Sequence, residues 1–278
     1  MGYLTVLYVF FVFFAALFGI VIGSFLNVVI YRVPEGKTIS KGHSMCMSCG
    51  HTLAAKDLVP LFSWLALKGK CRYCGAPVAS RYAKIESLTG AVYLLAALLH
   101  KEIGLWVLNE DHYYIYDLIY YALFVIAASA TIATMMIYHD TGKGFPGLAL
   151  YTLVPGVLST LLLTLYTKDI DPVFSLKYTT CACVISAIFV IACRVSAFIA
   201  RSEYTKADLG MDMAFAGMML FAQYLWMGHY KEGLITYASY GVFYMVFRRI
   251  MKGKAGDRYT GIVSAAVIVI LMIIRYFI

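Results

Sequence analysis

Two pairs of cysteines in a polar segment are the residues of this sequence most clearly suited to chemistry. The first pair lies in Cys46-Met47-Ser48-Cys49 and the second in Cys71-Arg72-Tyr73-Cys74. Twenty-one residues separate the pairs, close to the spacing of a four-cysteine zinc site. Four thiolates fill the tetrahedral shell of Zn²⁺ and leave no position for water, so we predict a structural zinc site. The alternative is four cysteines that are unpaired or joined by disulfides.

Three aspartates beside apolar segments form a second set of candidates. Asp140 ends one apolar run, and Asp208 and Asp212 precede another. Ionisable groups near membrane depth are costly, so each is a functional hypothesis. If Asp140 meets one of the later acids, the two carboxylates share one proton and form an acid–base pair able to hydrolyse a peptide bond. The alternative is that these acids only solvate helix ends.

The spacing of the later acids favours one of them. Asp208 follows the small residue Ala207, whereas the bulky Met211 precedes Asp212. Two carboxylates approach closely only where the neighbouring residue is small, so we predict Asp140 and Asp208 as the catalytic pair, with Asp212 as the alternative second acid. Asp208 and Asp212 are four residues apart and can share one helical face, so one acid can support the other.

The composition indicates an integral membrane protein. Of the 278 residues, 62% are hydrophobic and 14% are charged, whereas soluble domains average about 25% charged. A spanning helix needs about 20 mainly apolar residues. We predict an all-α polytopic membrane protein of about eight transmembrane helices, with a small zinc-binding module between the first two. The expected spans are Tyr3–Tyr31, Ile85–Leu99, Tyr116–Tyr138, Pro146–Tyr166, Val173–Ala200, Met213–Met227, Leu234–Phe247 and Ile262–Ile278.

The positive charge predicts an orientation. With alternating loops, 17 of the 23 Lys and Arg residues fall on one side, nine of them from Arg32 to Lys84. By the positive-inside rule this side is cytosolic, so the zinc module and the acids face the cytosol and both termini lie outside. The first span lacks the basic start of a cleaved signal peptide, and we expect it to be retained. The net charge of +8 then serves orientation and contact with the lipid bilayer, and we expect no nucleic-acid partner.

Several residues around the module have two interpretations. Asn27 either bonds neighbouring helices or, with Arg32, braces the module or lines a substrate groove. The apolar stretch Leu58–Leu67 is expected to form a short helix on the membrane interface or on the helical bundle. The basic cluster Arg248–Arg258 is expected to be a solvated, lipid-facing anchor; the alternative is a role in holding acidic groups of a substrate or lipid.

The run Gly23–Pro34, the two cysteine pairs, Arg81-Tyr82, Glu86 and Leu88-Thr89-Gly90 together resemble the amino-terminal part of type IV prepilin leader peptidases. The resemblance covers roughly a quarter of the chain. It implies a membrane aspartic peptidase that cuts the short basic leader from prepilins or pilin-like secretion and competence subunits on the cytosolic side of the plasma membrane. The family carries an aspartate near the position of Asp140 and a Gly-x-Gly-Asp motif near Asp208, although this chain keeps only a small residue before that acid.

The resemblance also implies a domain division and a second activity. Residues 1–32 are expected to form the first transmembrane helix, 33–84 the cytosolic four-cysteine zinc module, and 85–278 the transmembrane peptidase domain. Some family members N-methylate the new amino terminus with S-adenosylmethionine, but this sequence has no glycine-rich nucleotide loop. The alternative function is a non-enzymatic membrane assembly or transport protein whose zinc-stabilised module docks a partner.

Overall fold

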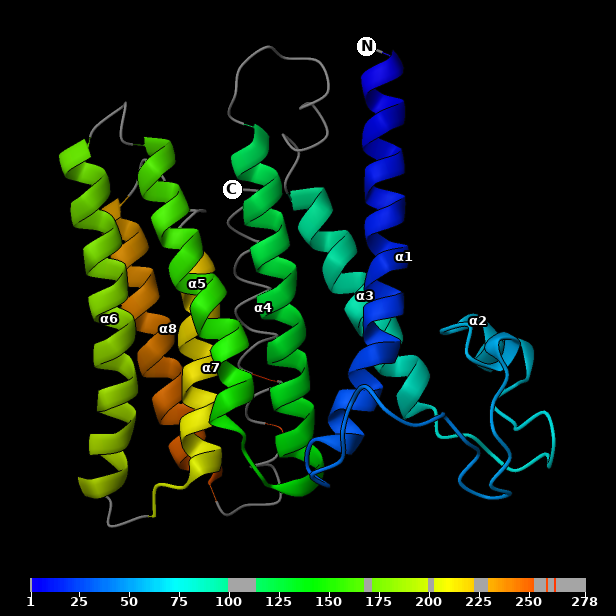
Figure 1. The fold of residues 1–278 in the computed structure, drawn as a ribbon. Helices are drawn as coiled ribbons and strands as arrows, with labels where there is room; N and C mark the ends of the chain where they lie inside the picture. Colours follow the sequence, from blue (N-terminus) through cyan, green and yellow to red (C-terminus); the bar gives the residue numbers. More distant parts are fainter. Residues whose placement is uncertain are drawn as a thin grey trace. The chain divides into compact units, whose positions relative to one another are not determined.

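The computed structural model describes residues 2–99, 114–167, 172–199, 203–222 and 230–252, together with Tyr259 and Val263. The chain divides into two compact units, Met1–Glu110 and Asp111–Ile278, and each is described by itself. Within the described ranges the chain is helical, and its only extended pairings are two isolated β-bridges, Met45 with Thr52 and Lys70 with Pro77. Figure 1 shows the order of the helices along the chain.

Two long helices form the frame of the first unit. Helix α1 is Gly2–Arg32 and α3 is Arg81–Leu99; between them lie a 3₁₀ turn, η1 (Ala55–Asp57), and the short helix α2 (Phe62–Ala66). A Cβ atom on Gly23 would lie 2.7 Å from the Cα of Glu86, and one on Gly90 would lie 2.6 Å from Ile20 Cγ1. Glycine therefore lets α1 and α3 pack with their backbones close together, as small residues do between helices in membranes.

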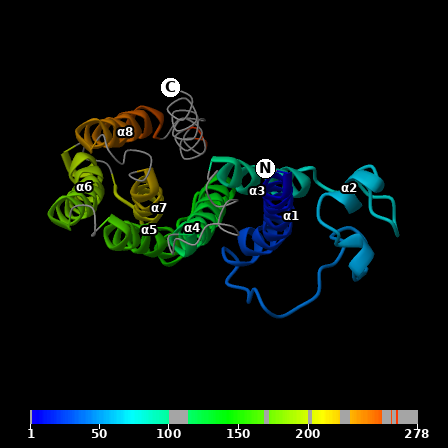
Figure 2. The same ribbon diagram turned by 90° about the horizontal axis from the view of Figure 1, so that it is seen from above.

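In the described residues of the second unit, five helices form a bundle. They are α4 (Tyr114–Thr141), α5 (Pro146–Thr167), α6 (Pro172–Ile199), α7 (Lys206–Ala222) and α8 (Tyr230–Met251). Helix α7 packs against α4, α5 and α6, and Figure 2 shows it inside an arc formed by the other four helices. A Cβ atom on Gly217 of α7 would lie 2.6 Å from the carbonyl carbon of Thr152 in α5, so these two helices also need glycine where they approach.

Aromatic side chains fill the core of this bundle. Phe189 of α6, Phe215 of α7 and Tyr244 of α8 form one buried cluster, and the Phe215 and Tyr244 rings stack with centroids 4.1 Å apart. Tyr120 of α4 donates its hydroxyl hydrogen to the carbonyl oxygen of Phe221 at 2.7 Å. The core thus fixes α7 and α8 against each other near the start of α7, where two aspartates lie.

The predicted fold class is confirmed: the described chain is all-helical, and the paired cysteines lie between its first two long helices. Three helices in the described ranges are long and apolar enough to cross a membrane: Val6–Arg32, Leu118–Thr141 and Thr180–Ile199. Pro146–Leu162 is a shorter apolar helix. The number of about eight spans is not confirmed, and the expected span Ile262–Ile278 lies outside the described residues except for Val263. A short helix within Leu58–Leu67 is confirmed as α2.

Candidate functional site

The four paired cysteines lie in two turns of the same construction. The N–H of Gly50 donates to the carbonyl oxygen of Cys46 at 2.9 Å, and the N–H of Gly75 donates to that of Cys71 at 3.0 Å. Both glycines have positive φ, 69° and 71°, a conformation that glycine adopts without the steric cost of a Cβ atom. The glycine after each cysteine pair therefore closes the turn and directs both thiols of the pair to one point.

The thiols fit a tetrahedral metal ion. The Sγ atoms of Cys46, Cys49, Cys71 and Cys74 all lie within 4.8 Å of one another, and those of Cys46 and Cys74 are 3.9 Å apart. Four Zn–S bonds of about 2.3 Å in a tetrahedron place the sulfur atoms about 3.8 Å apart. The predicted ligand set is thus brought close enough together to hold a metal ion.

The titration of the thiols also suits a cation. Backbone N–H groups of Cys49 and Ser48 lower the pKa of Cys46 to about 6. The N–H of Ala76 lowers the pKa of Cys74, but burial and the neighbouring thiols outweigh it and raise that pKa to about 11. Four negative thiolates this close repel one another, and a divalent cation among them removes the repulsion. A bound zinc ion would join the two turns and so stabilise the folded state of a module that has only a small apolar core.

An aspartate outside the cysteine cluster ties the second turn to η1. Asp57 Oδ1 accepts a hydrogen bond from Arg72 Nε at 2.6 Å, and its Oδ2 accepts one from the Tyr73 hydroxyl at 2.8 Å. The Arg72 guanidinium, with smaller help from Tyr73 and a backbone N–H, holds the pKa of Asp57 below its usual range against the opposing effect of burial. Trp64 of α2 donates from Nε1 to the carbonyl oxygen of Val78 at 3.1 Å, which fixes α2 to the same turn.

Side chains of α1 and α3 brace the module. Arg32 donates to the carbonyl oxygens of Thr38 at 3.1 Å and Lys41 at 2.6 Å, and so holds the loop that leaves α1. Asn27 Nδ2 donates to the carbonyl oxygen of Tyr82 in α3 at 3.2 Å. Of the two interpretations of Asn27, the structure therefore shows a bond between helices, and it shows the predicted bracing role for Arg32.

Asp208 lies in the first turn of α7 and closes its amino terminus. Its Oδ2 accepts hydrogen bonds from the backbone N–H of Thr205 at 2.7 Å and from the Thr205 hydroxyl at 2.8 Å. In return, the N–H of Asp208 donates to the Thr205 hydroxyl at 3.2 Å. This reciprocal pair is a capping box. The other carboxylate oxygen of Asp208, Oδ1, lies 2.5 Å from Arg248 Nη2. Lys252 Nζ lies 3.5 Å from Asp208 Oδ2.

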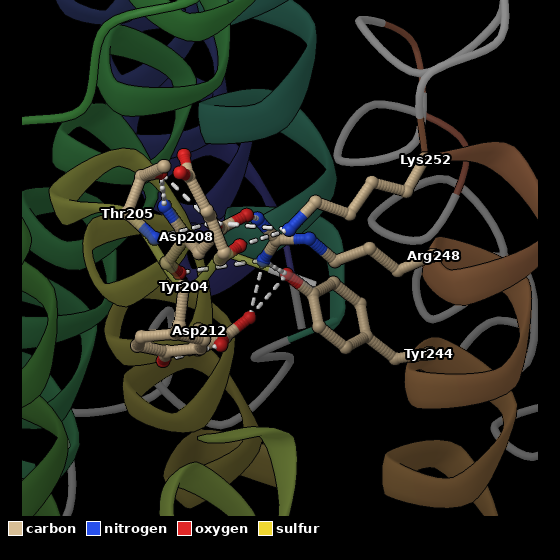
Figure 3. A network of polar contacts seen from close by, with 8 residues as sticks. Tyr204, Thr205, Asp208, Asp212, Tyr244, Arg248 and Lys252 are labelled. Carbon is tan, nitrogen blue, oxygen red and sulfur yellow. Dashed lines mark hydrogen bonds and ion pairs between the residues drawn. The ribbon is translucent and has the colours of Figure 1, made fainter. Parts of the chain in front are cut away.

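Asp212 lies one turn further along α7 and is more deeply buried. Its Oδ2 accepts a hydrogen bond from the Tyr204 hydroxyl at 2.7 Å, and its Oδ1 accepts one from the Tyr244 hydroxyl at 2.9 Å. Arg248 Nη1 also forms an ion pair with Asp212 Oδ1. Asp208 and Asp212 therefore share one helical face, as predicted, and both meet the same guanidinium group (Figure 3).

The expected role of Arg248 was wrong. Arg248 was predicted to belong to a solvated, lipid-facing anchor, but its side chain is only 11% exposed and binds two carboxylates. Tyr244 precedes it by one helical turn, and Arg248 Nη1 donates to the Tyr244 hydroxyl at 2.8 Å. The sequence did contain a pattern that could have indicated this ion pair. Asp208 and Asp212 are four residues apart, and so are Tyr244 and Arg248, so each pair can lie on one face of its helix. Burying a charged group needs such partners.

Asp140 ends α4, and its Oδ1 lies 3.0 Å from His139 Nδ1. The connector after Asp140 contacts the start of α7: a Cβ atom on Gly144 would overlap the Cα of Ala207. The structure thus brings the connector that follows Asp140 into contact with the first turn of α7.

A cavity of about 60 Å³ opens beside the two α7 aspartates. Acidic, basic and small side chains line it, among them Asp208, Asp212, Arg248, Lys252 and Ser196. This volume holds a few water molecules. Water therefore has access to the carboxylates at the start of α7.

The fold and these sites define a helical membrane protein with a four-cysteine module and a cluster of buried charges in its second unit. Residues 17–100 match the sequence model of a family described as the Bacterial Peptidase A24 N-terminal domain. The resemblance drawn from Gly23–Gly90 is confirmed for this part of the chain. No solved structure matches the protein.

Curated relatives match about a third of the chain. A prepilin leader peptidase/N-methyltransferase of Myxococcus xanthus is 47% identical over 92 residues, which cover 33% of this chain and 27% of the relative. A type 4 prepilin-like proteins leader peptide-processing enzyme of Escherichia coli is 40% identical over 108 residues, covering 32% of this chain and 40% of the relative. A prepilin leader peptidase/N-methyltransferase of Dichelobacter nodosus is 40% identical over 113 residues, covering 31% and 40%. The chain thus spans well under half of the length of each of these relatives.

Proposed function

We propose that the protein is a membrane aspartic endopeptidase that removes the short basic leader from prepilins or pilin-like secretion and competence subunits. The observation that carries this proposal is the match of residues 17–100 to the peptidase family, with relatives named for prepilin processing. The positive-inside rule supports placing the four-cysteine module and the acids on the cytosolic side of the plasma membrane, where a basic leader is accessible.

In this proposal Asp140 and Asp208 are the two catalytic acids. Arg248 and Lys252 next to Asp208 stabilise its ionised form, which suits a general base that activates water. Asp140 then carries the shared proton, polarises the peptide carbonyl and protonates the leaving amine. The contact between Gly144 and Ala207 supports bringing the two carboxylates together once a substrate is bound. Asp212, with both oxygens bonded to buried partners, is the supporting acid.

The test is cleavage of a pilin-like substrate by the full chain in lipid vesicles. Asp140→Asn and Asp208→Asn each remove a required carboxylate, and we expect cleavage to fall by at least about a hundredfold, the size of a general acid–base contribution. Glu35→Gln is the control, because Glu35 is an exposed residue whose carboxylate lies 3.6 Å from Lys37 Nζ at the surface. Full cleavage by either aspartate variant would contradict the assignment.

The names of the relatives join peptidase activity to N-methyltransferase activity, and we propose N-methylation of the new amino terminus as a second activity. S-adenosylmethionine would be the methyl donor. The test is transfer of a labelled methyl group from S-adenosylmethionine to the processed substrate. An unmethylated product from a chain that cleaves its substrate would refute this addition and leave the peptidase proposal intact.

A second candidate function is transport or assembly without catalysis. The observation in its favour is that Asp208 and Asp212 both bind Arg248 inside a membrane bundle, as charged groups in proton relays do. Under this alternative the four-cysteine module docks a partner protein. The same vesicles distinguish the two functions, because a transporter moves protons or solute without cutting the pilin-like substrate.

A further inference from the structure

Large apolar side chains on and beside the short helix of the four-cysteine module are exposed. Leu58 and Val59, just before α2, are 43% and 46% exposed, and Phe62 and Leu65 within α2 are each 54% exposed. Trp64, in contrast, turns its ring toward Gly69 and bonds Val78. Helix α2 therefore has one side held by the module and another side that is apolar and open.

A hydrogen bond fixes the level of α2 along the long helices. The backbone N–H of Leu61, directly before α2, donates to Glu86 Oε2 at 2.6 Å. Glu86 is buried, and its Cα lies 2.7 Å from the position of a Cβ atom on Gly23. Gly23 precedes the end of α1 at Arg32 by nine residues, which is about 13 Å along a helix. The start of α2 is thus level with the apolar run of α1 and not with its polar end.

The backbone at this point is also unusual. Leu61 has φ of 61° and ψ of −51°, and the N–H of Phe62 donates to the carbonyl oxygen of Pro60 at 2.6 Å. This is a γ-turn, a rare and strained conformation. This backbone conformation occurs at the residue whose N–H donates to Glu86. The turn allows Val59 and Phe62, on either side of it, both to remain exposed.

The membrane is the partner that these features fit. The face of α1 beside this level is already apolar and exposed, with Phe18, Val21 and Phe25 at 58%, 52% and 47%, as expected for contact with lipid. The segment from Arg32 to Lys84 has nine basic and two acidic residues, which favours the anionic surface of a bilayer. Short apolar helices flanked by Lys and Arg lie in the headgroup and upper acyl region of membranes.

We propose that Leu58, Val59, Phe62 and Leu65 insert into the lipid bilayer at the boundary between headgroups and acyl chains. Glu86 sets the depth of insertion through its bond to Leu61. The four-cysteine module is then anchored to the membrane at α2 as well as through α1 and α3. This inference does not depend on the proposed peptidase activity.

Photochemical cross-linking of the full chain in lipid nanodiscs tests the proposal. The bilayer is a mixture of phosphatidylcholine and phosphatidylglycerol, and p-benzoylphenylalanine replaces Phe62, Phe14 or Ile39 in separate preparations. Phe14, 60% exposed on α1, is the lipid-facing reference. Ile39 is the matched control: it is apolar and 44% exposed, but lies in the loop that Arg32 holds at the end of α1.

We expect lipid adducts at position 62 comparable to those at position 14, and few at position 39. The expected lipid adducts should persist in Glu86→Gln, which keeps a side-chain acceptor for Leu61, and should be lost in Glu86→Ala with the metal content unchanged. Adducts at position 62 with another copy of the chain or with another segment of it would overturn the proposal, as would no lipid adduct there. The probe at position 62 in the otherwise unchanged chain decides the question even if Glu86→Ala does not fold.

Discussion

Replacing Arg248 with methionine should destabilise the second unit strongly. The Arg248 side chain is 11% exposed, and the side chains of Asp208 and Asp212 that it binds are 8% and 2% exposed. Methionine keeps much of the apolar stem but leaves two buried carboxylates without their cation. Removing one partner from a buried ion pair costs about 3–5 kcal/mol. For a unit of this size that loss corresponds to a decrease in Tm of about 6–20 °C.

Thermal unfolding in detergent, followed by circular dichroism, measures this decrease. Arg249→Met is the matched control, because Arg249 donates to Ser196 at the exposed surface and such contacts contribute about 0–1 kcal/mol. Adding Asp212→Asn to Arg248→Met should recover part of the loss, since the asparagine carries no buried charge. If Arg248→Met has the same Tm as Arg249→Met, or if the double variant is less stable than Arg248→Met, then Arg248 does not hold the aspartates as the structure indicates.

Two further predictions concern the metal site and the approach of α4 to α7. Cys49→Ser should lose bound zinc by elemental analysis of the purified protein, while Cys193→Ser, outside the four-cysteine cluster, should retain it; equal zinc in both variants would refute the ligand assignment. Gly144→Ala places a Cβ atom against Ala207 Cα, whereas Gly147→Ala meets nothing within 4 Å. We expect Gly144→Ala alone to lower stability, by about 1–3 kcal/mol or more; equal melting of the two variants would show that the connector does not pack on α7.

The four-cysteine module was the most predictable part of the protein. The two C-x-x-C sequences place their thiols together because each forms the same local turn, closed by the glycine that follows. Local chemistry of this kind is encoded in a few consecutive residues. The short helix within Leu58–Leu67 and the bracing role of Arg32 were predictable for the same reason.

The charged cluster of the second unit was less predictable, because it joins side chains from α7 and α8. The local pattern Thr205-Lys206-Ala207-Asp208 is a recognisable helix start, and it would have placed Asp208 inside α7 and not before it. Arg248 was misassigned because a basic pair at the end of an apolar run is typical of a membrane anchor. Only the packing of α8 through Tyr244 turns this arginine toward the aspartates.

The pairing of Asp140 with Asp208 stays a prediction. The sequence places both acids at the ends of apolar segments, and the contact of Gly144 with Ala207 follows from having no side chain at that position. Whether two carboxylates share a proton depends on their separation at the scale of about 4–6 Å. Sequence patterns do not determine separations of that size between distant parts of a chain.

The most direct test of the account is the mass of the product released when the purified, zinc-loaded chain meets a pilin-like substrate in lipid vesicles. The account predicts a single cut between the basic leader and the apolar helix of the substrate, read by mass spectrometry as one new amino terminus. An intact substrate, with the protein folded and its zinc retained, would contradict the account.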